Sequence, residues 1–344
     1  MKRIQECLAA LLVTLLLPAA CFAGAGNRAG TNGASELLIP IGARDIAMGG
    51  ASASTSFGIE GLYWNPAAVA KSKYATAVYF SHMTYLADIG VNYGAISTTF
   101  EGFGTVALSL KSLSIGEIPV TTTTYPDGTG QTFTPQFFTL GLSYARELSD
   151  RVVVGLTTNL ISERMGDVSA SGLALNIGVL YDNLAAVEGL SLGVAVKNIG
   201  PQMRFDGSGL LVQASVAGQN RPAQFYQVEA ASFELPSSIE FSLGYRRSLD
   251  GVNNVMLATA FQSNNFSDDE YRIGAEYSYQ DLVFLRGGYN FAQRQSEERQ
   301  YLFGPSFGVG VRTALGSLEL SVDYAFRKVD VFDNNHVIGL RLGF

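Results

Sequence analysis

The chain has 344 residues and a formal net charge of −7, so we do not expect a nucleic-acid-binding protein, which needs a basic surface. Hydrophobic residues make up 47% of the sequence and charged residues only 15%, and the chain contains 38 glycines and 16 tyrosines. A soluble domain has about 25% charged residues. The composition therefore favours alternating strands that face lipid on one side, as in a membrane β-barrel.

The first 23 residues have the pattern of a secretory signal peptide. A basic start, MKR, precedes an apolar run over residues 8–20, and a small-residue cleavage site, CFA, ends at residue 23. Cleavage two residues later and lipidation at Cys21 are the alternatives. The run is shorter than the about 20 residues of a transmembrane helix. Because Cys7 and Cys21 both lie in this segment, we expect the mature chain to have neither disulfides nor thiolate metal sites.

Residues 24–73 come before the first alternating segment and have no strand period. They contain two motifs rich in small residues, GARDIAMGGASAS at 42–54 and LYWNPAAVA at 62–70. Small side chains allow close backbone packing, so we expect this segment to be a plug in the lumen of a barrel. The motif residues are Gly42, Arg44, Met48, Gly49, Gly50, Trp64, Asn65 and Pro66.

Two features of these motifs allow other interpretations. Residues 42–50 suggest a phosphate-binding loop, but they lack the Lys-Ser/Thr ending and do not follow a strand. Asn65-Pro66 is either a rigid turn that leads into the first strand or the gate of a lateral opening.

The rest of the chain, residues 74–344, alternates between apolar and polar or small residues, the period of β-strands. Because about fourteen such segments can be counted, we predict an all-β fold, an antiparallel transmembrane barrel of fourteen strands. Fourteen is an even number, as single-chain bacterial barrels require. The predicted strands are 75–82, 92–100, 104–114, 137–147, 151–164, 171–183, 190–200, 237–249, 253–264, 268–280, 282–292, 302–315, 317–329 and 335–344.

The predicted links are short at one end of the barrel and mostly longer at the other, as in outer-membrane barrels. The longer links are 83–91, 115–136, 165–170, 201–236 and 293–301. We expect the polar loop 115–136 and the apolar loop 201–236 to contact partners, and the second either to fold over the barrel mouth or to meet a partner. The candidate contact residues are Tyr125, Asp127, Phe205, Leu210, Phe225 and Tyr226.

Charged residues of both signs fall on the predicted lumen side of the strands. They are Glu240, Arg246, Arg272, Glu276, Arg286, Arg312, Glu319, Asp323, Arg327 and Arg341. Because unpaired charges in a confined interior are unfavourable, we expect a structural network that joins the strands to the plug. A selective ion path is the alternative.

The sequence offers little for catalysis. His82 and His336 are the only histidines, and we expect them at the outer ends of the neighbouring first and last strands. A metal site there, with Asp88 or Asp333, and calcium sites at the acidic clusters 268–270 and 330–333 are the alternatives to a polar rim. We expect neither enzymatic activity nor a cofactor.

The last ten residues, NHVIGLRLGF, alternate strictly and end on Phe344. An ordinary edge strand would also alternate, but this ending resembles the closing strand of an outer-membrane barrel. In such barrels the terminal aromatic residue helps the insertion machinery to recognise the chain, so the resemblance implies that machinery and outer-membrane lipid as partners.

The two N-terminal motifs, the loop YPDGTGQTF at 125–133 and the segments LGLSYAREL and RVVVGLTTNLISE resemble the PorV/PorQ family over essentially the whole mature chain. That family is similar to FadL-type barrels, which have fourteen strands and an N-terminal hatch with an Asn-Pro-Ala motif. The resemblance implies a component of type IX secretion that binds the C-terminal signal domain of cargo, with secretion-system subunits as further partners. The alternative that it implies is a FadL-like channel for hydrophobic compounds.

Overall fold

The computed structural model describes residue 28 and residues 30–215, 222–292 and 301–344. The expected signal peptide, residues 1–23, lies outside the described residues, so its cleavage stays a prediction.

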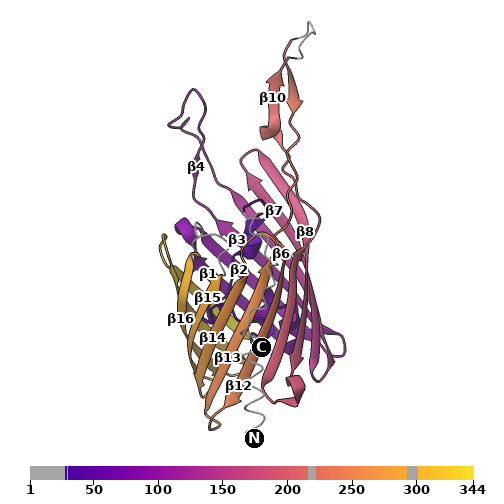
Figure 1. Cartoon of the computed structure of the whole chain (residues 1–344), viewed down its shortest axis with the longest axis vertical. Helices are drawn as coiled ribbons and strands as arrows, with labels where there is room; N and C mark the ends of the chain where they lie inside the picture. The colour runs from indigo at the N-terminus through magenta and orange to yellow at the C-terminus, as the bar shows by residue number, and fades with distance from the viewer. Residues whose placement is uncertain (1–27, 29, 216–221, 293–300) are drawn as a thin grey trace.

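Fourteen antiparallel strands form a closed barrel, whose overall shape is seen in Figure 1. The barrel closes where β1 pairs with the last strand, β18. Each of the other barrel strands pairs with the barrel strands before and after it in the chain. The predicted fold class and number of strands are confirmed. The barrel strands are β1 (Thr76–Thr84), β2 (Gly90–Phe100), β3 (Gly104–Ser114), β6 (Gln136–Ser149), β7 (Val152–Met165), β8 (Val168–Asp182), β9 (Leu190–Ile199), β12 (Ser238–Ser248), β13 (Asn253–Asn264), β14 (Glu270–Tyr279), β15 (Val283–Ala292), β16 (Phe303–Leu315), β17 (Leu318–Val329) and β18 (Asn335–Gly343).

The strands alternate between an inner and an outer face, as their sequences predict. In β18, Ile338 is 55% exposed whereas its neighbour Val337 is fully buried, and Arg341 is buried as well. The outer face is the apolar band that lipid covers in a membrane barrel. The barrel closes through main-chain bonds near the C-terminus, where Phe344 N donates to Thr76 O at 2.9 Å.

The short turns lie at one end of the barrel and most of the long links at the other. One predicted long link is wrong. The strands β7 and β8 stay paired up to Met165 and Val168, so the expected loop 165–170 is a two-residue turn, Gly166-Asp167. Gly166 takes φ +57°, a conformation that glycine adopts without strain. Several residues of 165–170 therefore continue the strands.

The remaining elements are short. The segment before the barrel contains η2 (Ser35–Leu38), α2 (Ala43–Ala47), η3 (Gly58–Tyr63) and η4 (Pro66–Lys71), and the links contain η5 (Leu86–Asp88), η6 (Leu184–Ala186) and η7 (Ser208–Leu210). Two hairpins project beyond the rim at the long-loop end (Figure 1): β4 (Ile118–Pro119) with β5 (Thr132–Phe133), and β10 (Leu211–Ala214) with β11 (Gln224–Gln227). Within the described residues, no helix has the length and apolar character needed to cross a membrane.

Candidate functional site

The segment before the first strand packs against the inner wall of the barrel. Its helix α2 contacts β15, β16, β17 and β18, whereas η4 contacts β3, β6, β7 and β8 on the other side. Ile41, Ile46 and Trp64 of this segment are buried in one apolar cluster with Tyr79 and Val337 of the wall. Its contacts on opposite sides therefore place this segment in the barrel interior; its role as a plug stays a prediction.

The motif glycines bring the two backbones into close contact. A Cβ on Gly288 of β15 would lie 2.1 Å from Gly49 N, and a Cβ on Gly274 of β14 would lie 2.3 Å from Met48 O. Gly49 itself takes φ +66°, a region that favours glycine. Glycine is therefore needed on both sides of this contact.

Asn65 fixes the turn that leads into η4. Its Oδ1 accepts a hydrogen bond from Ala67 N at 3.0 Å, and Pro66 occupies the first turn of the helix. Its Nδ2 donates to Ala53 O at 2.8 Å and to Val179 O of β8 at 3.1 Å. This is the geometry of an N-cap with proline behind it, so the rigid-turn interpretation accounts for both residues.

A chain of ion pairs runs from α2 into the wall. Arg44 Nε lies 3.1 Å from Glu276 Oε2, and Arg44 Nη1 lies 2.9 Å from Asp45 Oδ1. Glu276 also contacts Arg286 Nε at 2.6 Å, and Arg286 Nη1 contacts Asp323 Oδ1 at 2.5 Å. All five side chains are buried. The expected network that joins strands to the N-terminal segment is present.

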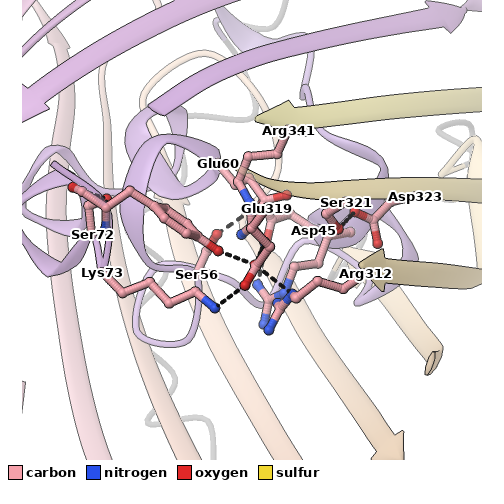
Figure 2. Close-up of polar contacts among 12 residues, drawn as sticks. Asp45, Ser56, Glu60, Ser72, Lys73, Arg312, Glu319, Ser321, Asp323 and Arg341 are labelled. Atoms are coloured by element: carbon pink, nitrogen blue, oxygen red, sulfur yellow. Dashed lines mark hydrogen bonds and ion pairs between the residues drawn. The ribbon is translucent and has the colours of Figure 1, made fainter. Parts of the chain in front are cut away.

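A second network gathers around Glu319 of β17 (Figure 2). Its carboxylate lies 2.7 Å from Lys73 Nζ, 3.2 Å from Arg312 Nε and 3.2 Å from Arg341 Nη2, and it also accepts a hydrogen bond from Tyr74. Arg341 reaches the N-terminal segment at the same time, because its Nη1 lies 2.9 Å from a carboxylate oxygen of Glu60.

Two buried lysines of the wall, Lys111 and Lys197, complete the inner network and were not singled out from the sequence. Lys197 Nζ lies 3.0 Å from Glu240 Oε2 and 5.5 Å from the ring centre of Trp64. Lys111 Nζ donates to Glu36 O at 2.6 Å. Strand parity was the available signal, since both lysines occupy inward positions of β3 and β9.

Two carboxyl groups of the N-terminal segment lie in an unfavourable environment for charge. Burial raises the pKa of Glu36 to about 8, and the neighbouring carboxylate of Glu163 adds to this effect. Burial also raises the pKa of Asp45 to about 7, against the opposing effect of Arg44. The segment therefore carries protonatable groups at its contact with the wall.

The candidate partner-contact residues fall into two groups. Tyr125 and Phe225 are 61% and 70% exposed on the two projecting hairpins, where Asp127 and Tyr226 are exposed as well. Phe205 is half-buried at the base of loop 201–236, where its ring centre lies 5.4 Å from that of Phe233.

The base of loop 201–236 packs on the barrel and its tip projects. Met203 and Leu235 are buried in a cluster with Leu37 of the N-terminal segment and Ile161 of β7. Leu210 ends η7 just before the hairpin begins. The loop thus divides into a packed base and a projecting hairpin, rather than behaving as one unit; residues 216–221 at its tip lie outside the described residues.

Comparison with known proteins identifies the family. A family model described as "Type IX secretion system protein PorV" matches residues 22–216, more than half of the chain. The chain belongs to the PorV family. A search of curated proteins found no match.

The PorV-family chain is similar in fold to several solved barrels. It shares 14% identity and a TM-score of 0.52 with the CymD monoaromatic hydrocarbon channel, covering 89% of this chain and 98% of that one. With the Pseudomonas putida toluene transporter TodX it shares 11% identity and a TM-score of 0.54, covering 88% of this chain and 96% of that one. With a FadL homologue of Pseudomonas aeruginosa it shares 11% identity and a TM-score of 0.51, covering 89% of this chain and 98% of that one. At these identities the likeness shows the fold alone.

Barrel fold and PorV-family membership together indicate an outer-membrane protein. The two histidines lie on the neighbouring strands β1 and β18, as expected, but on the outer face. His82 Nδ1 lies 2.8 Å from Asn92 Oδ1, and His336 Nδ1 lies 2.7 Å from Tyr324 Oη. Throughout the part of the chain that the structure describes, no group of three acidic, histidine or cysteine residues is placed to hold a metal ion.

Proposed function

We propose that this protein is a non-enzymatic component of type IX secretion that binds the C-terminal signal domain of secreted proteins at its outer rim. The family match over residues 22–216 carries this proposal. The partners are the cargo proteins and other subunits of the secretion system, and binding needs neither a cofactor nor a metal ion.

The outer hairpin β10–β11 supports the proposal. Leu211, Val212, Phe225 and Tyr226 are each more than 40% exposed there, and Val212 pairs with Tyr226 across the hairpin. Exposed apolar side chains that stand clear of the barrel suit contact with another protein. We assign the cargo contact to this hairpin, together with Tyr125 and Asp127 of the other hairpin.

Affinity purification of the tagged protein from native outer membranes, followed by mass spectrometry, tests this function. We expect secretion-system subunits and proteins that share a C-terminal domain. The double variant Phe225→Ser, Tyr226→Ser should reduce their recovery about tenfold or more, because interface aromatics contribute much of the binding energy. The control is Val331→Ser, an 82% exposed apolar residue outside both loops. Equal recovery with the double variant and the control would contradict the assignment to the hairpin.

A FadL-like channel for hydrophobic compounds is the second candidate, favoured by the fold of the hydrocarbon channels. A cavity of about 240 Å³ on the long-loop side of α2 is lined by the rings of Trp64, Tyr85 and Phe303. Lys197 and Arg327 line it as well. An apolar solute would leave these cations without water, which is unfavourable. Retention of lipids or hydrocarbons, with no protein partner, would favour the channel and reject the secretion function.

We also propose that residues 24–73 form a plug that closes the lumen in either function. The close contact of Gly49 with Gly288 and the buried ion pairs of Arg44 and Glu60 support this role. Limited proteolysis of the folded protein tests it. Residues 34–73 should resist cleavage as long as the barrel stays folded, and rapid cleavage of this segment would show that it does not fill the lumen.

A further inference from the structure

A cavity of about 570 Å³ lies at the short-turn end of the barrel, below the N-terminal segment. Short turns face the periplasm in outer-membrane barrels, so this cavity is on the side opposite to the hairpins of the proposed function. Six cations line it: Arg44, Lys71, Lys73, Arg246, Arg312 and Arg341. Four carboxylates line it as well: Glu60, Asp182, Glu276 and Asp281.

Arg246 at the end of β12 makes no ion pair within the described residues, although Glu276 and Asp281 line the same cavity and act on it from farther away. No carboxylate of the described residues lies within 4 Å of its guanidinium, which is exposed towards the cavity. The guanidinium lies 5.5 Å from the ring centre of Phe57, and its Nη2 lies 3.8 Å from Met256 Sδ. A ring face and a sulfur atom support the side chain but leave most of its N–H donors free.

Across the same cavity, three cations share one carboxylate. Lys73, Arg312 and Arg341 all contact Glu319, as Figure 2 shows. Of these three cations, only Arg341 has a second carboxylate partner within the described residues, Glu60. The Nε of Arg341 has no hydrogen-bond partner in the part of the chain that the structure describes. Three positive charges therefore face two negative ones in this group. With Glu319 counted, six cations stand against five carboxylates around the cavity, which leaves an excess of positive charge.

We propose that this cavity binds a small oxyanion from the periplasm, of which phosphate is the simplest. Guanidinium groups bind phosphate through paired N–H donors, and the Arg246 guanidinium makes no ion pair among the described residues that would occupy these donors. The ligand lies between Arg246 and the Glu319 group, in contact with the wall and with Lys73 of the N-terminal segment. It therefore links the segment to the barrel. This inference is independent of the proposed secretion function.

Titration calorimetry with inorganic phosphate tests the site on the purified full-length protein in a non-ionic detergent at constant ionic strength. We expect saturable binding by the wild type. Arg246→Gln and Arg312→Gln should each weaken it about tenfold or more, since each removes a charged hydrogen-bond donor. The matched control is Arg247→Gln, because Arg247 is the next residue of β12 and faces the opposite way. Arg246→Lys keeps the charge and should retain part of the affinity.

Two results would overturn the proposal: no saturable binding by the wild type, or an equal loss of affinity in Arg247→Gln. Gel shift on heating shows whether each variant is folded, and Arg246 and Arg312 give two independent tests if one variant does not fold. The source of the phosphate group is tested with vesicles of phosphatidylcholine alone and with added phosphatidylglycerol. If phosphate binds in phosphatidylcholine vesicles but not in those with phosphatidylglycerol, the lipid headgroup occupies the site and is the ligand. If phosphate binds in both kinds of vesicle, the ligand is a free anion. Either result supports the site.

Discussion

Arg44 and Glu276 form a buried ion pair, with Nε 3.1 Å from Oε2, although 232 positions separate them in the sequence. Arg44 belongs to the helix α2 and Glu276 to the wall strand β14. The same guanidinium also contacts Asp45 and donates to Thr55 O at 3.2 Å. One side chain thus joins two parts of the N-terminal segment to the barrel.

We expect Arg44→Gln to destabilise the folded protein by about 3 kcal/mol, because loss of one partner leaves a buried charge without compensation. Asp45 loses the one ion-pair partner it has among the described residues, whereas Glu276 keeps Arg286. Denaturant unfolding in detergent measures this effect. Lys328→Gln serves as control, because its exposed pair with Asp330 contributes at most about 1 kcal/mol. Equal stability of the two variants would show that the Arg44 pair does not hold the segment.

The barrel could be predicted from the sequence because its strands repeat one local rule. Alternation of apolar and polar residues identified all fourteen strands, and parity placed Glu276, Arg286 and Asp323 on the inner face. The turn at Gly166 was missed because polar residues of β7 and β8 continue beyond the membrane band, where alternation no longer separates strand from loop.

The contacts of the N-terminal segment could not be predicted in the same way. That segment has no period, so the sequence shows which glycines are present but not that Gly49 meets Gly288. The hairpin β10–β11 was missed for a similar reason, since both of its faces are exposed and no core selects a register. Lys111 was missed because its acceptors, Glu36 O and Ile39 O, are main-chain atoms of that aperiodic segment.

The contact between Gly288 and Gly49 predicts that the N-terminal segment packs against β15 only if residue 288 is a glycine. In Gly288→Leu the new side chain would occupy the space of Gly49, so we expect residues 34–72 to become sensitive to protease while the barrel stays folded. Gly287→Leu is the matched control. Its Cβ would meet only Phe307 at 3.8 Å on the outer face, so the segment should stay protected. Cleavage at the same rate in both variants would contradict the packing.

Glu36 predicts a pH dependence of stability. Its pKa is raised from about 4.5 to about 8 in the folded protein, by burial and by Glu163. Between these values the folded state binds more protons than the unfolded state, so stability falls as pH rises through this window. Glu36→Gln should reduce this slope, to which Asp45 also contributes, and stabilise the protein at pH 8 by at least about 1 kcal/mol. Unfolding at pH 5, 6.5 and 8 measures it, and an unchanged slope in the variant would assign the dependence to another group.

Substitution of Phe344 should impair assembly of the barrel in the membrane but not its folding. Its side chain points outward and is 54% exposed, while its main chain pairs with Ala75 and Thr76. Phe344→Ala keeps these main-chain bonds, so we expect the purified variant to fold in detergent like the wild type. In cells, the amount of barrel in the outer membrane should fall several-fold, if the insertion machinery recognises the terminal ring. Phe80→Ala is the control, because Phe80 is equally exposed on the neighbouring strand β1. If loss of hydrophobic surface were the cause, the amount of barrel in the outer membrane would fall equally for both variants. If the terminal residue is recognised, that amount falls only for Phe344→Ala.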